Sequence, residues 1–215
     1  MVAKWTKSKG KSRVLAVGAH PDDIEVGCVG TLLKHKSCGD QVIVAITTQG
    51  GYGDRSWKQI KSEARNASRI LGSEYIILDN KIGHYEMTWK TVTELDNIIS
   101  EFKIDTVYSV WHGDSHQDHR LTFQNVLAAC RKKSIRNLYC YELSDYSYRS
   151  QNTFNARFFV DISDHMENKI ESIKCYKSYI TKQQTEAVVG LAKHRGLACG
   201  SEYAEAFEPV FNIWK

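Results

Sequence analysis

The sequence lacks several features that would point to other classes of protein. It contains only two prolines in 215 residues, and its six cysteines form no Cys-x-x-Cys pair. No apolar run approaches the roughly 18 residues of a membrane-spanning helix, and the first residues lack the apolar core of a secretory signal. We therefore expect a cytoplasmic protein with reduced cysteines, and disulfides are the alternative.

Acidic side chains are absent from the first 13 residues, which carry five lysines and arginines. The remaining residues carry 24 basic and 25 acidic side chains, so the body offers no basic face for nucleic acid. The length, with 42% apolar and 25% charged residues, is typical of one globular domain. We expect a frayed basic tail over residues 1–12 and a single domain over residues 13–215.

Strand-like and helix-like segments alternate over the first 140 residues. Between the strand-like runs, apolar residues recur at helical spacing, as at Ile60, Ala64, Ala67 and Leu71. This alternation predicts βαβ units and an α/β fold with a mostly parallel sheet. The runs with the composition of buried strands are residues 14–17, 41–47, 75–78, 106–111 and 138–143.

The pattern changes after residue 144 and indicates a C-terminal αβ extension. Residues 144–155 are polar and aromatic, which favours an excursion near the site or an oligomer contact in a trimer or hexamer. A strand is expected over residues 158–162, and Ser163 is expected to cap a helix whose stripe continues to Ile180.

A second helix is expected over residues 184–194. The chain should then end in a strand over residues 207–214. Proline cannot donate to a strand ladder, so Pro209 predicts an edge position for that strand.

The first polar cluster, Gly18–Glu25, directly follows a strand-like run. His20 and Asp23 can face one metal ion, while the adjacent Asp22 points elsewhere and can take a proton from water. Asp22 or Asp23 alone would equally suit a helix N-cap. Ligands bind beyond the carboxyl ends of parallel strands, which is where this turn falls.

The second cluster, residues 112–119, follows another strand-like run and contains three of the eight histidines. With His119, the first cluster supplies two imidazoles and a carboxylate, which is a typical catalytic zinc set that leaves one position for water. His116 lies one helical turn from His119 and can serve as the acid or the oxyanion donor. Asp118 or Asp114 can orient His116 and keep it protonated.

These histidine-rich residues would, taken alone, suit a solvated loop or helix start. The two clusters together, each after a parallel strand, favour a metal hydrolase. His112 competes with His116 for the acid role. A third loop, residues 47–54, is polar and rich in glycine, so Gln49 and Gly50 are candidate substrate contacts, although a purely structural loop fits equally.

The two clusters resemble the HPDD and HxDH motifs of the LmbE-like, PIG-L-type zinc de-N-acetylases. Glu63 and residues 203–207 resemble later landmarks of the same family, so the resemblance spans about residues 13–210. It implies a Rossmann-like three-layer sandwich and removal of an acetyl group from an N-acetylated amino sugar. It also implies that Tyr203 contacts the reacting acyl group.

The site residues that the resemblance implies agree with the assignment from the residues alone. It implies metal ligands His20, Asp23 and His119, Asp22 as the base and His116 as the acid or oxyanion partner.

The chain departs from the family pattern at two positions. Ile60 stands where the family often has an arginine three residues before the helical glutamate, and Arg55 and Arg65 are out of phase with that position. Gln117 replaces a frequent proline of the second motif, which we expect to be neutral. Without that arginine, the sequence does not indicate which polar group of the substrate the protein binds.

The leading hypothesis is a zinc-dependent deacetylase acting on an N-acetylated amino sugar or its conjugate, a small-molecule substrate. Fe(II), Co(II) or Mn(II) would also suit the ligand set. One alternative is an amidase acting on a non-sugar or thiol-conjugate amide. Another is a non-catalytic dinucleotide-binding module, although the two aspartates stand where its glycine-rich turn would bind pyrophosphate.

Overall fold

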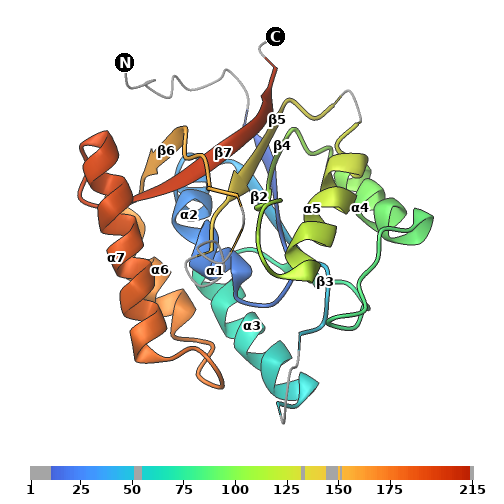
Figure 1. Ribbon diagram of the computed structural model, residues 1–215, viewed down its shortest axis with the longest axis horizontal. Helices are drawn as coiled ribbons and strands as arrows, with labels where there is room; N and C mark the ends of the chain where they lie inside the picture. Colours follow the sequence, from blue (N-terminus) through green and yellow to red (C-terminus); the bar gives the residue numbers. More distant parts are fainter. Residues whose placement is uncertain (1–10, 51–54, 132–133, 144–149, 151, 214–215) are drawn as a thin grey trace.

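The computed structural model describes residues 11–50, 55–131, 134–143, 150 and 152–213 (Figure 1). Most of the predicted basic tail, and most of the predicted excursion over residues 144–155, lie outside these residues. Among the described helices, none is long and apolar enough to cross a membrane. All six cysteines are free thiols, so the disulfide alternative is wrong.

The described strands form one seven-stranded sheet in the order β3-β2-β1-β4-β5-β7-β6. The five strands from β3 to β5 are parallel, and β7 runs antiparallel to both β5 and β6. The predicted mostly parallel α/β sheet is confirmed. The strands are β1 (Arg13–Gly18), β2 (Gln41–Ile46), β3 (Tyr75–Ile77), β4 (Thr106–Val110), β5 (Asn137–Tyr141), β6 (Phe158–Asp161) and β7 (Ala204–Asn212).

Helices cover both faces of this sheet, which makes the three layers visible in Figure 1. The helices are α1 (Asp23–Gly27), α2 (Val29–Ser37), α3 (Trp57–Leu71), α4 (Trp89–Glu101), α5 (Gln117–Ala129), α6 (Met166–Ile173) and α7 (Lys182–Cys199), with a short 3₁₀ turn over Ser163–His165.

Alternating side chains of β1 belong to two different cores. Val14 and Ala16 pack in the core that includes residues of α2, whereas Leu15 and Val17 pack in the core that includes residues of α4 and α5. Both faces of a central parallel strand are therefore buried. This burial explains why the strand reads as a continuous apolar run.

The two polar clusters meet because β1 and β4 are neighbours in the sheet. Val17 is in register with Ser109, so the turns that follow both strands emerge at the same edge. The chain crosses from β3 at one end of the parallel segment to β4 on the other side of β1. This reversal is the topological switch point at which open α/β sheets bind their ligands.

The helical segment after the first cluster is divided into two helices. Cys28 has an extended φ of −147° and separates α1 from α2. The predicted cap at Ser163 is wrong, because Ser163 donates its N–H and hydroxyl to Asp161 and starts a 3₁₀ turn instead.

Two further expectations for the C-terminal part are wrong. The helix predicted to continue to Ile180 is shorter, because α6 ends at Ile173. The segment that follows α6 bonds the buried carboxylates of Glu25 and Glu63. Strand β7 lies between β5 and β6 and is not an edge. Pro209 fits there because β6 pairs only with residues 204–207, so at Pro209 the strand has, in the described sheet, a neighbour on the β5 side alone.

Candidate active site and metal centre

Asp23 closes the turn after β1 with one carboxylate oxygen and leaves the other for the site. Its Oδ2 accepts hydrogen bonds from the backbone N–H groups of Ala19 at 2.7 Å and His20 at 2.9 Å. Its Oδ1 lies 3.5 Å from Nε2 of His119. The turn therefore aims one oxygen of a buried carboxylate at an imidazole from the second cluster.

Asp22 stands at the start of α1 in a strained backbone conformation. Its φ of 121° is in the left-handed region, and its side chain makes no capping hydrogen bond. The helix-cap alternative for Asp22 is therefore wrong. Burial and the neighbouring Asp23 carboxylate both raise the pKa of Asp22 well above its ordinary value. Such strain is found at functional sites, where the surrounding structure holds a side chain in place.

The second cluster occupies the start of α5. His116 is the N-cap residue, and its Nδ1 accepts the backbone N–H of Asp118 at 3.1 Å. A neutral imidazole that accepts through Nδ1 carries its proton on Nε2. His116 thus has the tautomer of a hydrogen-bond donor at Nε2. His119 lies one turn further and is almost completely buried.

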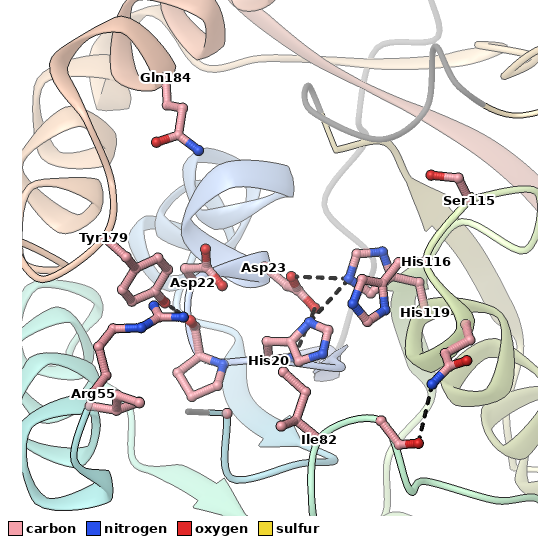
Figure 2. A pocket seen from close by; sticks show the side chains of 15 residues that line it. His20, Asp22, Asp23, Arg55, Ile82, Ser115, His116, His119, Tyr179 and Gln184 are labelled. Atoms are coloured by element: carbon pink, nitrogen blue, oxygen red, sulfur yellow. Dashed lines mark hydrogen bonds and ion pairs between the residues drawn. The ribbon is translucent and has the colours of Figure 1, made fainter. Parts of the chain in front are cut away.

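Donor atoms of His20, Asp23 and His119 converge (Figure 2). Nδ1 of His20 lies 3.2 Å from Nε2 of His119, and Asp23 oxygens lie 3.5 Å from that Nε2 and 3.8 Å from that Nδ1. Ligands about 2.0–2.2 Å from a tetrahedral ion would be roughly 3.3–3.6 Å apart. The separations of 3.2 and 3.5 Å lie near that range, and the separation of 3.8 Å involves the Asp23 Oδ2 that also accepts two backbone N–H groups. The donor set therefore suits a small divalent cation.

His116 lies close enough to offer a different third ligand. His20, His116 and His119 each present an atom within 4.8 Å of the others, and the His20 and His116 ring centres are 4.6 Å apart. Two candidate triads thus share His20 and His119 and differ in Asp23 or His116.

The two shared imidazoles lie in a strongly negative environment. Burial opposes protonation of His20, but hydrogen bonds to Asp118 and Asp23 outweigh it and raise its pKa to about 9. For His119, burial is outweighed by Asp23 and Asp114, and the pKa rises to about 10. Such a pocket favours positive charge between its carboxylates, and a bound cation supplies that charge while the imidazoles release protons.

Asp118 and Asp114, the two carboxylates expected to orient His116, contact other imidazoles in the structure. Asp118 Oδ2 contacts Nε2 of His20 at 3.2 Å and accepts the N–H of Gly83 at 2.8 Å. Asp114 Oδ2 lies 3.0 Å from Nδ1 of His119. Both carboxylates therefore orient candidate metal ligands. Burial and the neighbouring His20 and His119 lower the pKa of His116 to about 4, contrary to the expected imidazolium.

A cavity of about 630 Å³ opens beside these residues, which is the size of a small-molecule site. The residues that line it come from five separate parts of the chain and are His20, Pro21, Asp22, Asp23, Gly50, Arg55, Ile60, Ile82, Gly83, Ser115, His116, Gln117, His119, Tyr179 and Gln184.

The predicted substrate contacts are only partly in this cavity. Gly50 lines it in a left-handed conformation, with φ of 70°. Gln49 is absent from the described lining, and its amide donates to Asp79. Tyr203 is also outside the lining, and its N–H bonds Ser163 between β6 and β7. His112 pairs with Glu208 at 3.0 Å outside the lining, so it does not compete with His116 there.

Sequence reasoning missed three polar residues of the cavity, Arg55, Tyr179 and Gln184. Arg55 does not have the spacing from Glu63 that the family resemblance predicts for an arginine. Tyr179 and Gln184 lie more than 150 residues beyond the first cluster, and no local pattern marks them. Their placement depends on how the C-terminal extension packs on α3 and α1, which periodicity does not reveal.

The PIG-L family, described as GlcNAc-PI de-N-acetylases, matches residues 15–130. This match covers more than half of the chain and contains both polar clusters. The chain belongs to the PIG-L family. Membership makes it an enzyme of the deacetylase class, which hydrolyses amide bonds.

Two relatives of this PIG-L protein are also named deacetylases. It is 33% identical to the "uncharacterized deacetylase YaiS" of Escherichia coli K12 over 139 residues, which is 61% of this chain and 73% of that protein. It is 26% identical to the diacetylchitobiose deacetylase of Thermococcus kodakarensis over 226 residues, which is 94% of this chain and 84% of that protein.

Solved structures confirm the fold of this PIG-L protein. The N,N'-diacetylchitobiose deacetylase of Pyrococcus horikoshii has a TM-score of 0.79 at 22% identity, covering 94% of this chain and 85% of that one. The 4-carboxy-2-hydroxymuconate hydratase of Pseudomonas putida KT2440 has a TM-score of 0.84 at 19% identity, covering 96% and 98%. One fold thus supports two reactions, and the chemistry must be argued from the site.

Proposed function

We propose that this chain is a zinc-dependent hydrolase that removes the acetyl group from an N-acetylated amino sugar or its conjugate. The observation that carries this proposal is the convergence of His20, Asp23 and His119 at the cavity. Membership of the family supports an acetamide as the group that is hydrolysed. The named activity of the Thermococcus relative supports an amino sugar as the part of the substrate that carries it.

The proposed ligands are two neutral imidazoles and one carboxylate, which leave the site a net positive charge. Zinc, when bound, lowers the pKa of a coordinated water to about 7 and polarises a carbonyl. His20 and His119 are oriented by Asp118 and Asp114, which fix the ring nitrogens that face the ion. The same donors would accept Fe(II), Co(II) or Mn(II).

Asp22 is the proposed general base. It lines the cavity, its side chain makes no capping hydrogen bond, and its neighbour Asp23 takes the proposed ligand position. Its carboxylate would take a proton from the attacking water as the water oxygen bonds to the acetyl carbon. The same proton then goes to the amine nitrogen as the carbon–nitrogen bond breaks, so the products are acetate and the free amine.

His116 is the proposed donor to the oxygen of the reacting carbonyl. Its Nδ1 accepts from the backbone, which places the proton on Nε2, and the ring lies at the cavity beside His20 and His119. A fixed N–H that stabilises the developing oxyanion contributes roughly 100- to 1000-fold in rate. In this role His116 acts as a neutral donor, which is the oxyanion alternative expected from the sequence and not the protonated acid.

The proposal is tested by measuring acetate release from a panel of acetamides with the zinc-loaded protein. The panel contains N-acetylglucosamine, N,N'-diacetylchitobiose, N-acetylglucosamine 1-phosphate and the non-sugar amide N-acetylcysteine. Release of acetate from at least one sugar, with at least tenfold lower kcat/KM for N-acetylcysteine, is the expected result. Activity only on the non-sugar amide, or on none of the four, would contradict the proposal.

A further inference from the structure

The cavity wall opposite the imidazoles carries an aromatic and cationic pair. Figure 2 shows Arg55 and Tyr179 on one side of the cavity, with His116 and His119 on the other. The guanidinium carbon of Arg55 lies 4.2 Å from the centre of the Tyr179 ring. Arg55 is the one lysine or arginine among the described residues of the lining.

Tyr179 is fixed by contacts to two other parts of the site. Its hydroxyl donates to the carbonyl of Pro21 in the first cluster. The preceding residue, Ser178, donates its N–H at 2.9 Å and its hydroxyl at 2.6 Å to the buried carboxylate of Glu63 on α3. These bonds hold the ring of Tyr179 at a set place beside the turn that carries Asp22.

A second buried carboxylate holds the same segment. The hydroxyl of Tyr176 donates to Glu25 at 3.1 Å, and Glu25 lies fully buried on α1. The segment between α6 and α7 is therefore anchored to α1 and to α3. Arg55 directly precedes the Ser56 cap of α3, so both partners of the pair are attached to the same anchored framework.

The chemistry of this pair suits a negatively charged group. A guanidinium presents five N–H donors in a planar fork that matches carboxylate or phosphate oxygens, and an aromatic face reduces the freedom it would lose on binding. Ile60, at the position where the family often has an arginine, contributes only apolar surface to the lining. Arg55 thus supplies positive charge from a different point of the chain.

We propose that Arg55, held on Tyr179, binds a phosphate or carboxylate group of the substrate, at the wall of the cavity across from the scissile amide. The inference rests on the proposed function and narrows its substrate class to anionic conjugates or derivatives of an N-acetylated amino sugar. The amide of Gln184, directed toward the cavity in Figure 2, lies on the same side and can contact neighbouring oxygens.

The test compares two matched pairs of probes. One pair is N-acetylglucosamine 1-phosphate and methyl N-acetylglucosaminide, and the other is N-acetylmuramic acid and N-acetylglucosamine. The wild-type protein should show at least tenfold higher kcat/KM for the anionic member of at least one pair. Arg55→Gln should reduce that ratio about tenfold or more, since a hydrogen bond to a charged group is lost.

The matched control is Arg65→Gln, which removes the same charge from an exposed position on α3 outside the cavity. It should leave the ratio within twofold of the wild type. An unchanged ratio in Arg55→Gln would overturn the inference, as would equal kcat/KM for both members of both pairs in the wild type.

A binding titration separates this inference from the proposed function. The zinc-loaded full-length protein is titrated calorimetrically with N-acetylglucosamine 1-phosphate. Binding that weakens at least tenfold in Arg55→Gln and not in Arg65→Gln supports the anion site even if no acetate is released. Equal binding by both variants and the wild type overturns it, whatever the deacetylase assay shows.

Discussion

Nδ1 of His20 lies 3.2 Å from Nε2 of His119, although 99 residues separate them in the chain. The contact arises because β1 and β4 are adjacent parallel strands, so the turn after one meets the first helical turn after the other. Asp23 then approaches both nitrogens from within the first turn. The convergence of these three side chains is therefore a consequence of the sheet topology acting on two short motifs.

Replacement of Asp22, the proposed base, should greatly reduce turnover and leave the bound zinc in place. Asp22→Asn preserves the size of the side chain but cannot take a proton from water, so kcat should fall about 10²- to 10⁴-fold. Acetate release and elemental analysis on the same preparation measure both effects. Asp164→Asn, the same change at an exposed position, is the control. Near-wild-type kcat in a zinc-loaded Asp22→Asn protein would contradict the base assignment.

Asp118 should act through His20 and not through His116. Its Oδ2 lies 3.2 Å from Nε2 of His20, the nitrogen remote from the proposed ion. Loss of such a carboxylate typically weakens metal binding about 10- to 100-fold. Asp118→Asn should show this loss in a competition titration with a zinc chelator. Unchanged zinc affinity, with lower activity alone, would return Asp118 to the role expected from the sequence.

The buried pair Lys169–Glu205 should be a major support of the C-terminal extension. The Lys169 ammonium lies 2.7 Å from Glu205 and donates to the carbonyls of Glu25 and Val26, while Glu205 accepts the N–H groups at the start of α2. Lys169→Met leaves a buried charge without its partner, so unfolding free energy should fall by about 3–5 kcal/mol.

The surface pair Lys182–Glu186 provides the control for that measurement. Its atoms are 3.5 Å apart and exposed, so Lys182→Met should change stability little. Urea unfolding of the two variants gives the comparison. Equal stability of Lys169→Met and Lys182→Met would show that the buried pair contributes no more than an exposed one.

His35 should make stability depend on pH below 6.5. Burial lowers its pKa from 6.5, although Asp40 opposes the shift, and its other nitrogen contacts the hydroxyl of Tyr108. Below pH 6.5 the unfolded chain therefore binds a proton more readily than the folded one, so this residue costs stability as pH falls and costs none above pH 6.5.

Unfolding free energies at pH 5.0 and 7.5 test this effect. The wild type should lose more stability between pH 7.5 and pH 5.0 than His35→Gln does. His84→Gln, at an exposed position, should follow the wild type. An equal loss in the wild type and His35→Gln would contradict the account of His35.

The sequence was sufficient to predict the sheet and the meeting of the two polar clusters at its edge. The continuous apolar runs identify β1 and β4 as buried strands, and parallel order then brings His20 and His119 to one edge. The alternation of strands and helices depends on residues close together in the chain, so it can be read from the sequence. The order of β7 and β6 depends on long-range pairing. Pro209 lies where β7 has one neighbour only in the described sheet, but the proline gives no sign that β6 pairs with residues 204–207 of the same strand.

The distal wall of the cavity could not be predicted for the same physical reason. Tyr179 reaches the site because Ser178 and Tyr176 bond two buried carboxylates, Glu63 and Glu25, from distant helices. Neither bond leaves a periodic signal. Tyr203, expected at the substrate from the resemblance, directly precedes β7 and donates its N–H to Ser163, outside the described lining of the cavity.

The central claim is that His20 and His119 hold one catalytic divalent cation, and zinc stoichiometry coupled to acetate release tests it most directly. Chelator-treated protein should regain one zinc per chain and its deacetylase activity together, with a sharp end point at one equivalent. The double variant His20→Ala/His119→Ala should bind no stoichiometric zinc and remain inactive. Full activity without bound metal, or stoichiometric zinc in the double variant, would contradict the account.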